Sequence, residues 1–154
     1  MDHIAKALID WCDSISPKLK EYVIHNNGLG EEVKREFFEF FKLHSSHLVL
    51  SEQPVYESKD NVDLVFNPMA ENPKEKVIAE FNIESKDGTN FERSVLDDIN
   101  KLSMIANIKD DYKNAIKCVI SLYYNISNRN QLHDKDFIEL YNDLEIGCAL
   151  KRLK

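Results

Sequence analysis

The sequence predicts a single α/β domain, residues 1–154, built on a mixed central sheet of about four strands flanked by helices. Three observations predict it. Apolar residues recur at helical spacing before residue 43, which is typical of amphipathic helices. Three β-type runs follow between residues 47 and 84, and a further helical segment then leads to an almost continuous apolar run at 115–124. A chain of 154 residues is long enough to bury one core of its own.

The first segment is an expected amphipathic helix over residues 2–15. Its apolar positions recur every three or four residues. Pro17 is expected to interrupt the helix, because proline removes one of its hydrogen bonds, and a short second helix would then run to about Val23. The apolar stripe consists of Ile4, Leu8, Trp11, Cys12 and Ile15.

A glycine-containing loop at 25–30 leads to the next expected helix, residues 31–43. Glu36 lies three residues after one apolar position and four before another, so it borders the face that should be buried. That buried stripe consists of Val33, Phe37, Phe40 and Phe41.

Three strands are expected next. The first covers residues 47–50, with an alternative in which it continues past Pro54 to Tyr56. The second covers 62–66 and the third 76–84. The turn-rich segment between the last two contains two prolines, which indicates a hairpin loop and therefore antiparallel pairing.

Two of these strands each place a carboxylate among apolar residues. Asp63 interrupts the second strand and Glu80 the third. An uncompensated carboxylate inside a strand costs several kcal/mol. Pairing around a loop centred near residue 71 puts Asp63 opposite a residue near position 79, so the two carboxylates are expected to meet. A shared divalent cation would compensate both.

The third strand alternates in character, which assigns its side chains to two faces. Glu80 and Asn82 fall on the face that also carries Ile78, Glu84 and Lys86. The opposite face carries Val77, Ala79, Phe81 and Ile83.

A turn at Asp87-Gly88 is expected to follow, and then a helix to about Asn107. Thr89 and Glu92 have the spacing of a capping box at its start. After the central strand at 115–124, a last helix is expected from about Asp134 to Leu144, and the tail at 147–154 is ambiguous.

The order helix, three strands, helix, strand, with these carboxylates, resembles the PD-(D/E)xK restriction-endonuclease-like superfamily, over about residues 31–125. Asp63 corresponds to the motif aspartate, and Glu80-Phe81-Asn82 stands where (D/E)-x-K stands. The resemblance implies Mg²⁺ held by Asp63 and Glu80, DNA as substrate and, as in many members, a homodimer. It also implies that Glu36 corresponds to the extra acidic residue that many members carry on the preceding helix, where it would complete the metal site; alternatively, Glu36 is a surface glutamate of that helix.

The motif lysine is replaced by Asn82, which cannot carry a positive charge. Lys86, Lys101 or Arg93 would then supply the cation. Alternatively, Glu84-Ser85-Lys86 is itself the motif, although this moves the site away from Asp63; Glu80 is preferred. Asp98 and Lys101 are three apart on the following helix, so they are also candidates to pair with each other.

Two functions remain open at this point, beside the possibility of an unrelated α/β module in which the two carboxylates are incidental. The first is a Mg²⁺-dependent nuclease in which Asp63, Glu80, Asn82 and Lys86 are the catalytic candidates. The second is a catalytically silent pseudo-nuclease that binds nucleic acid or a protein partner. A net charge of −7 argues against broad adhesion to nucleic acid. With no apolar run long enough to span a bilayer and no secretory signal, a cytoplasmic protein without a membrane partner is expected.

Overall fold

A computed structural model describes residues 1–26, 28–85 and 90–154. Its helices are α1 (Asp2–Asn26), α2 (Glu32–His44), α3 (Phe91–Ser103) and α4 (Ile126–Asp134). Its strands are β1 (Val49–Gln53), β2 (Val62–Phe66), β3 (Val77–Ile83), β4 (Ile116–Tyr123), β5 (Ile138–Asn142) and β6 (Gly147–Leu153).

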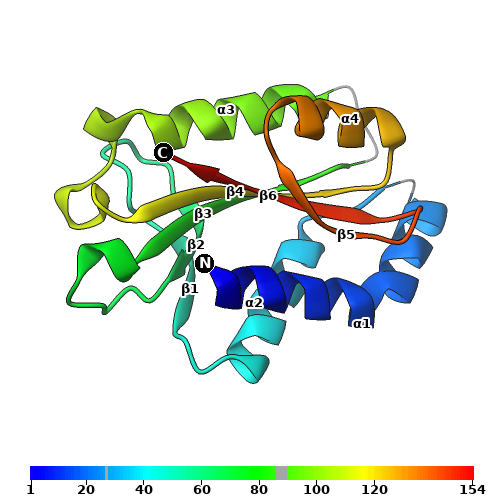
Figure 1. The fold of residues 1–154 in the computed structure, drawn as a ribbon, viewed down its shortest axis with the longest axis horizontal. Coiled ribbons are helices and arrows are strands. Elements are labelled where there is room, and N and C mark those ends of the chain that lie inside the picture. The colour runs from blue at the N-terminus through cyan, green and yellow to red at the C-terminus, as the bar shows by residue number, and fades with distance from the viewer. Residues whose placement is uncertain (27, 86–89) are drawn as a thin grey trace.

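These strands form one mixed sheet in the order β1-β2-β3-β4-β6-β5. β3 and β4 run parallel, and the other neighbouring pairs are antiparallel. α1 and α2 cover one face of the sheet, and α3 and α4 cover the other (Figure 1). The α/β class with a mixed sheet is confirmed. The expected number of about four strands is wrong, since the described residues form six.

The core beneath α1 and α2 is rich in aromatic side chains. The Trp11 and Phe37 rings meet edge to face with centroids 5.3 Å apart, and Phe37 meets Phe81 of β3 at 5.7 Å. Edge-to-face contacts of this kind add to the free energy gained by burial.

Within the described residues, no helix is both long and apolar enough to cross a membrane.

Pro17 does not end α1, so the expected break is wrong. The helix continues to Asn26 with Pro17 exposed on its outer side. The buried stripe runs through the proline, because Trp11 and Cys12 before it and Leu19 after it pack into one core. Packing of one continuous apolar face stabilises the helix on both sides of the lost hydrogen bond.

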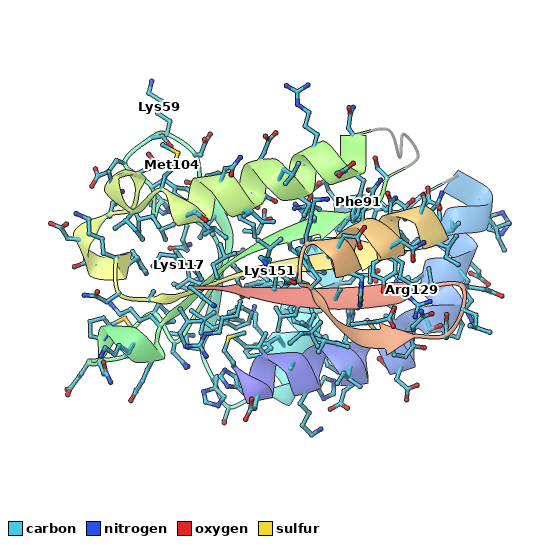
Figure 2. All side chains as sticks on the ribbon, turned by 45° about the horizontal axis from the view of Figure 1, so that its top comes forward. Lys59, Phe91, Met104, Lys117, Arg129 and Lys151 are labelled. Carbon is cyan, nitrogen blue, oxygen red and sulfur yellow. The ribbon has the colours of Figure 1, made fainter. Side chains whose placement is uncertain are left out.

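The core beneath α3 is smaller, and it sits against the centre of the sheet. In Figure 2, α3 runs from Phe91 at its start to Met104, the residue just past its end. Its buried residues pack against β4, which lies between β3 and β6 and is buried over most of its length. The prediction of a central, two-sided strand is therefore confirmed. The expected turn at Asp87-Gly88 and the cap at Thr89 lie outside the described residues.

The C-terminal quarter differs most from expectation. The helix there is α4, which ends at Asp134 rather than beginning there. The predicted helix around 137–144 is instead β5, and the ambiguous tail is β6. The spacing of apolar residues was misleading, because Ile138 and Leu144 are exposed and the segment is held by pairing with β6.

The first strand is also displaced from its expected position. β1 covers Val49–Gln53 rather than 47–50, and it does not extend through Pro54. Tyr56 instead forms an isolated antiparallel bridge with Ile108, which lies between α3 and β4. The connection from β1 to β2 therefore crosses to the α3 side of the sheet.

Candidate active site

Asp63 and Glu80 lie side by side where the pairing of β2 with β3 ends. The register runs from Phe66 opposite Val77 to Leu64 opposite Ala79. Beyond it, Asp63 Oδ2 accepts the backbone N–H of Phe81 at 2.7 Å, and Glu80 Oε2 accepts the backbone N–H of Asp63 at 3.4 Å. The two carboxylates thus take the place of ladder hydrogen bonds at this point, and they lie together as the hairpin register predicted.

Glu80 is almost completely buried, with 3% of its surface exposed. Its Oε1 accepts the Tyr56 hydroxyl at 2.6 Å and lies 3.1 Å from Nζ of Lys101. Burial, and then the charge of Asp63, raises the pKa of Glu80 to about 7, while the Tyr56 hydrogen bond and the Lys101 charge oppose that rise. Near neutral pH this carboxyl group is therefore poised to gain or lose a proton.

Asn82 is held by two residues of α3. Its side-chain amide donates to Asp98 Oδ2, and its Oδ1 accepts the Ser94 hydroxyl at 2.6 Å. Burial raises the pKa of Asp98 to about 6, although the charge of Lys101 opposes this. The expected alternation of β3 is thus confirmed, because both Glu80 and Asn82 face α3. Lys101 forms its ion pair with Glu80 rather than with Asp98.

Asp63 also faces a cation from α2. Lys34 Nζ lies 3.3 Å from Asp63 Oδ2 and 3.3 Å from Glu31 Oε2. Asp63 and Lys34 line a pocket of about 460 Å³ between α2 and the β1–β2 edge, which Arg35 and Phe38 also line. The pocket gives a solvent route to one side of the carboxylate pair, since the Asp63 side chain remains 18% exposed.

The structure does not bring Glu36 to this cluster. Its Oε1 accepts the Tyr22 hydroxyl at 3.1 Å and pairs with Lys18, both on α1. Lys34 and Glu36 flank the same buried stripe on opposite sides. Which of the two faces α1 and which faces the sheet edge depends on how α2 is rotated about its own axis on the sheet. The spacing of the apolar residues does not indicate that rotation.

Sequence reasoning also missed Tyr56, Lys34 and Ser94. Tyr56 was read only as part of an extended strand, and no motif marks its hydroxyl. Lys34 stands next to a stripe residue, which is a weak signal shared by every residue that borders a buried face. Ser94 had one usable signal: it lies four residues before Asp98 and so shares a helix face with it.

Lys86, which is both a candidate cation and the lysine of the alternative motif, lies outside the described residues. Glu84, the ligand of the alternative motif, is 1% exposed and serves another purpose. Its Oε2 accepts the backbone N–H groups of Tyr124 at 2.7 Å and Asn125 at 2.9 Å. It thereby holds the end of β4 and the start of α4, away from Asp63.

Glu84→Ala is expected to lower the free energy of unfolding by about 2 kcal/mol, because two part-buried N–H groups lose a charged acceptor. Urea unfolding of the variant and the wild type measures this change. Glu92→Ala, on the exposed start of α3, is a suitable control and should change stability by less than about 1 kcal/mol. A Glu84 variant as stable as the wild type would contradict this role.

The raised pKa of Asp98 predicts a pH-dependent stability. The folded chain binds the Asp98 proton more tightly than the unfolded chain does, because the pKa rises from 3.8 to about 6 on folding. Stability from this group is therefore greatest below about pH 4 and declines as the pH rises through about 6. Asp98→Asn removes the titration but keeps an oxygen for Asn82.

Unfolding free energies of wild type and Asp98→Asn, measured in urea from pH 4 to 8, test this expectation. The free energy of unfolding of Asp98→Asn, relative to that of the wild type, should increase as the pH rises, by at most about 3 kcal/mol. A difference between the two proteins that stays constant with pH would contradict it.

The donor set suits one kind of metal site and not another. Within residues 1–26, 28–85 and 90–154, no group of three or more His, Cys, Asp or Glu side chains is placed to hold a metal ion. Among these residues, a site built entirely from protein ligands is not supported. Mg²⁺, however, is commonly held by one or two carboxylates with waters and substrate phosphates, and the closely spaced Asp63 and Glu80 fit that pattern.

Comparison with known proteins adds no relative. No protein-family model matches the chain, and no curated protein or solved structure matches it. The chemistry of this site rests on its own residues: two adjacent carboxylates, one buried and one partly exposed, each with an ammonium group beside it.

Proposed function

We propose that this chain is a nuclease-like protein of the PD-(D/E)xK type that hydrolyses DNA phosphodiesters with Mg²⁺. The observation that carries the proposal is the position of Lys101. Its Nζ lies 3.1 Å from Glu80 Oε1, so an ammonium group accompanies the carboxylate pair although position 82 is asparagine. A lysine from α3 would thus supply the charge that the motif lacks on β3.

In this proposal, Asp63 and Glu80 would hold Mg²⁺. The chemistry that the ion supplies at such a site is activation of water and neutralisation of phosphate charge. Lys101 is 26% exposed, so its ammonium group can also face a substrate phosphate and stabilise the charge that develops there. Lys34 and Arg35, which line the pocket beside Asp63, would attract the neighbouring phosphates.

Asn82 has a positioning role in this scheme. Its carbonyl oxygen and one of its N–H groups are engaged by Ser94 and Asp98. It therefore links β3 to the face of α3 that carries Lys101, which fixes the lysine relative to Glu80.

A second function, binding without cleavage, is favoured by the engagement of Asn82, and the net charge of −7 suits a protein partner better than nucleic acid. The protein would then use the same surface to contact nucleic acid or a protein partner. The two functions differ in what a restored lysine would do at position 82.

Cleavage of plasmid and linear DNA with Mg²⁺ or Mn²⁺, by wild type and by Asn82→Lys, separates the two functions. We expect metal-dependent cleavage by the wild type, and no increase in Asn82→Lys, because Lys101 already provides the cation. Cleavage that appears only in Asn82→Lys would indicate a dormant site. No cleavage and no calorimetric signal with either metal in both proteins would overturn the proposal.

A further inference from the structure

Tyr56 lies at the centre of the site although no motif marks it. The side chain is completely buried, and its hydroxyl donates to Glu80 Oε1 at 2.6 Å. Nζ of Lys101 lies 4.9 Å from the centroid of the Tyr56 ring and 3.1 Å from the same Glu80 oxygen. Tyr56 therefore contacts both members of the Glu80–Lys101 pair, one through its hydroxyl and one through its ring.

The backbone around Tyr56 is tied to the segment that follows α3. The N–H of Glu57 donates to the Asn107 carbonyl at 2.7 Å, and the N–H of Lys109 donates to the Val55 carbonyl at 2.9 Å. With the bridge between Tyr56 and Ile108, these bonds form a clip on both sides of the tyrosine. Figure 2 shows Lys59, in the same connection, at the end of α3 where Met104 lies.

The clip connects Tyr56 with the segment that follows the helix carrying Lys101. Lys101 stands on the last turn of α3, just before the segment to which the clip attaches. One backbone unit thus sets the position of both donors that reach Glu80 Oε1. A glutamate side chain has several rotatable bonds, and two donors on one oxygen restrict it to one orientation.

We infer that Tyr56 is a positioning residue, which holds the Glu80 carboxylate in the orientation in which Lys101 and Asp63 can act with it. This role rests on the proposed function where it concerns turnover. The geometric part, that Tyr56 keeps Glu80 paired with Lys101, stands without it.

Tyr56→Phe removes the hydroxyl and keeps the ring. Tyr123→Phe is a matched control, because Tyr123 is also buried and its hydroxyl donates to Glu139 Oε1 at the same distance, 2.6 Å, outside this site. Both variants lose one tyrosine–glutamate hydrogen bond from a buried ring; the bond is buried at Tyr56 and part-buried at Tyr123, so a merely structural effect should be of similar size in the two.

Two measurements follow on wild type, Tyr56→Phe and Tyr123→Phe. In cleavage assays with Mg²⁺, we expect kcat of Tyr56→Phe to fall about 10- to 100-fold with KM changed by less than about twofold. Tyr123→Phe should retain both values. In the metal-free proteins, the ¹⁵Nζ resonance of Lys101 should shift in Tyr56→Phe alone, because its partner carboxylate is no longer held.

The outcomes separate the two proposals. Wild-type kcat in Tyr56→Phe, or an equal loss in Tyr123→Phe, would overturn the positioning role. If the wild type cleaves no DNA, the proposed function fails, and the Lys101 resonance still decides the role of Tyr56. An unshifted resonance in Tyr56→Phe would overturn it, and a shift found only there would support it.

Discussion

Lys101→Met is expected to reduce Mg²⁺-dependent DNA cleavage by at least about 100-fold, the loss typical when one preorganised donor to a developing charge is removed. Methionine keeps most of the length and apolar volume of the lysine stem, so packing on the Tyr56 ring should largely persist. The ammonium group beside Glu80 is lost. Because the charge of Lys101 opposes the rise in the pKa of Glu80, its removal should raise that pKa further. More of the carboxyl group is then protonated at pH 7 and unavailable to a cation.

Lys135→Met provides the matched control for this substitution. Lys135 is similarly covered, and its Nζ lies 2.8 Å from Oε1 of Glu92 in the first turn of α3. The control therefore removes an ion pair to the same helix without touching Glu80, and cleavage should remain within about twofold of the wild type. Equal rates for Lys101→Met and Lys135→Met would show that Lys101 is not the missing cation. Initial rates on supercoiled DNA measure both variants.

Asp63→Asn is expected to abolish cleavage and to weaken Mn²⁺ binding at least about tenfold, measured by calorimetry. Asparagine retains an oxygen for the Phe81 N–H, so the end of the β2–β3 pairing should survive. The negative charge next to Glu80 disappears, and with it one of the two carboxylates available to the metal. Since the charge of Asp63 raises the pKa of Glu80, the pKa of Glu80 should fall in this variant.

Two opposing effects therefore meet in Asp63→Asn. Glu80 becomes more fully charged at neutral pH, yet the metal is bound less tightly. Glu84→Gln is the control, because Glu84 also accepts backbone N–H groups at a strand end and lies outside the cluster. The Mn²⁺ affinity of Glu84→Gln should equal that of the wild type. Undiminished Mn²⁺ affinity in Asp63→Asn would contradict the assignment of Asp63 and would favour the binding module without metal.

The parts of the site that could be predicted are those set by short-range geometry. Asp63 and Glu80 meet because a hairpin brings its strands together in a register that the loop and the apolar pattern determine. The facing of Glu80 and Asn82 toward α3 follows from the two-residue alternation of a strand. The helical spacing of Asp98 and Lys101 places both on one face of α3. It does not determine whether Lys101 pairs with Asp98 or with Glu80.

The parts that could not be predicted depend on contacts between distant segments. Pro17 lies inside α1 because the core on one side of the sheet accepts a single long apolar stripe. The segment at 137–144 has apolar residues at helical spacing, yet it becomes β5 because β6 offers it a pairing edge. Tertiary context overrides local preference most easily where the apolar pattern is short and the exposed residues are themselves apolar.

The amino-acid sequence by itself determined the α/β class, the hairpin that joins the carboxylates of residues 63 and 80, and the face of β3 on which the site lies. These features depend on periodicity and on pairing between neighbours in the chain. Only the tertiary structure decided which cations and which tyrosine contact these carboxylates. Lys34, Tyr56 and Lys101 reach the carboxylates from three separate elements, and the rotation of a helix on a sheet, or the path of a connection across it, is set by long-range packing.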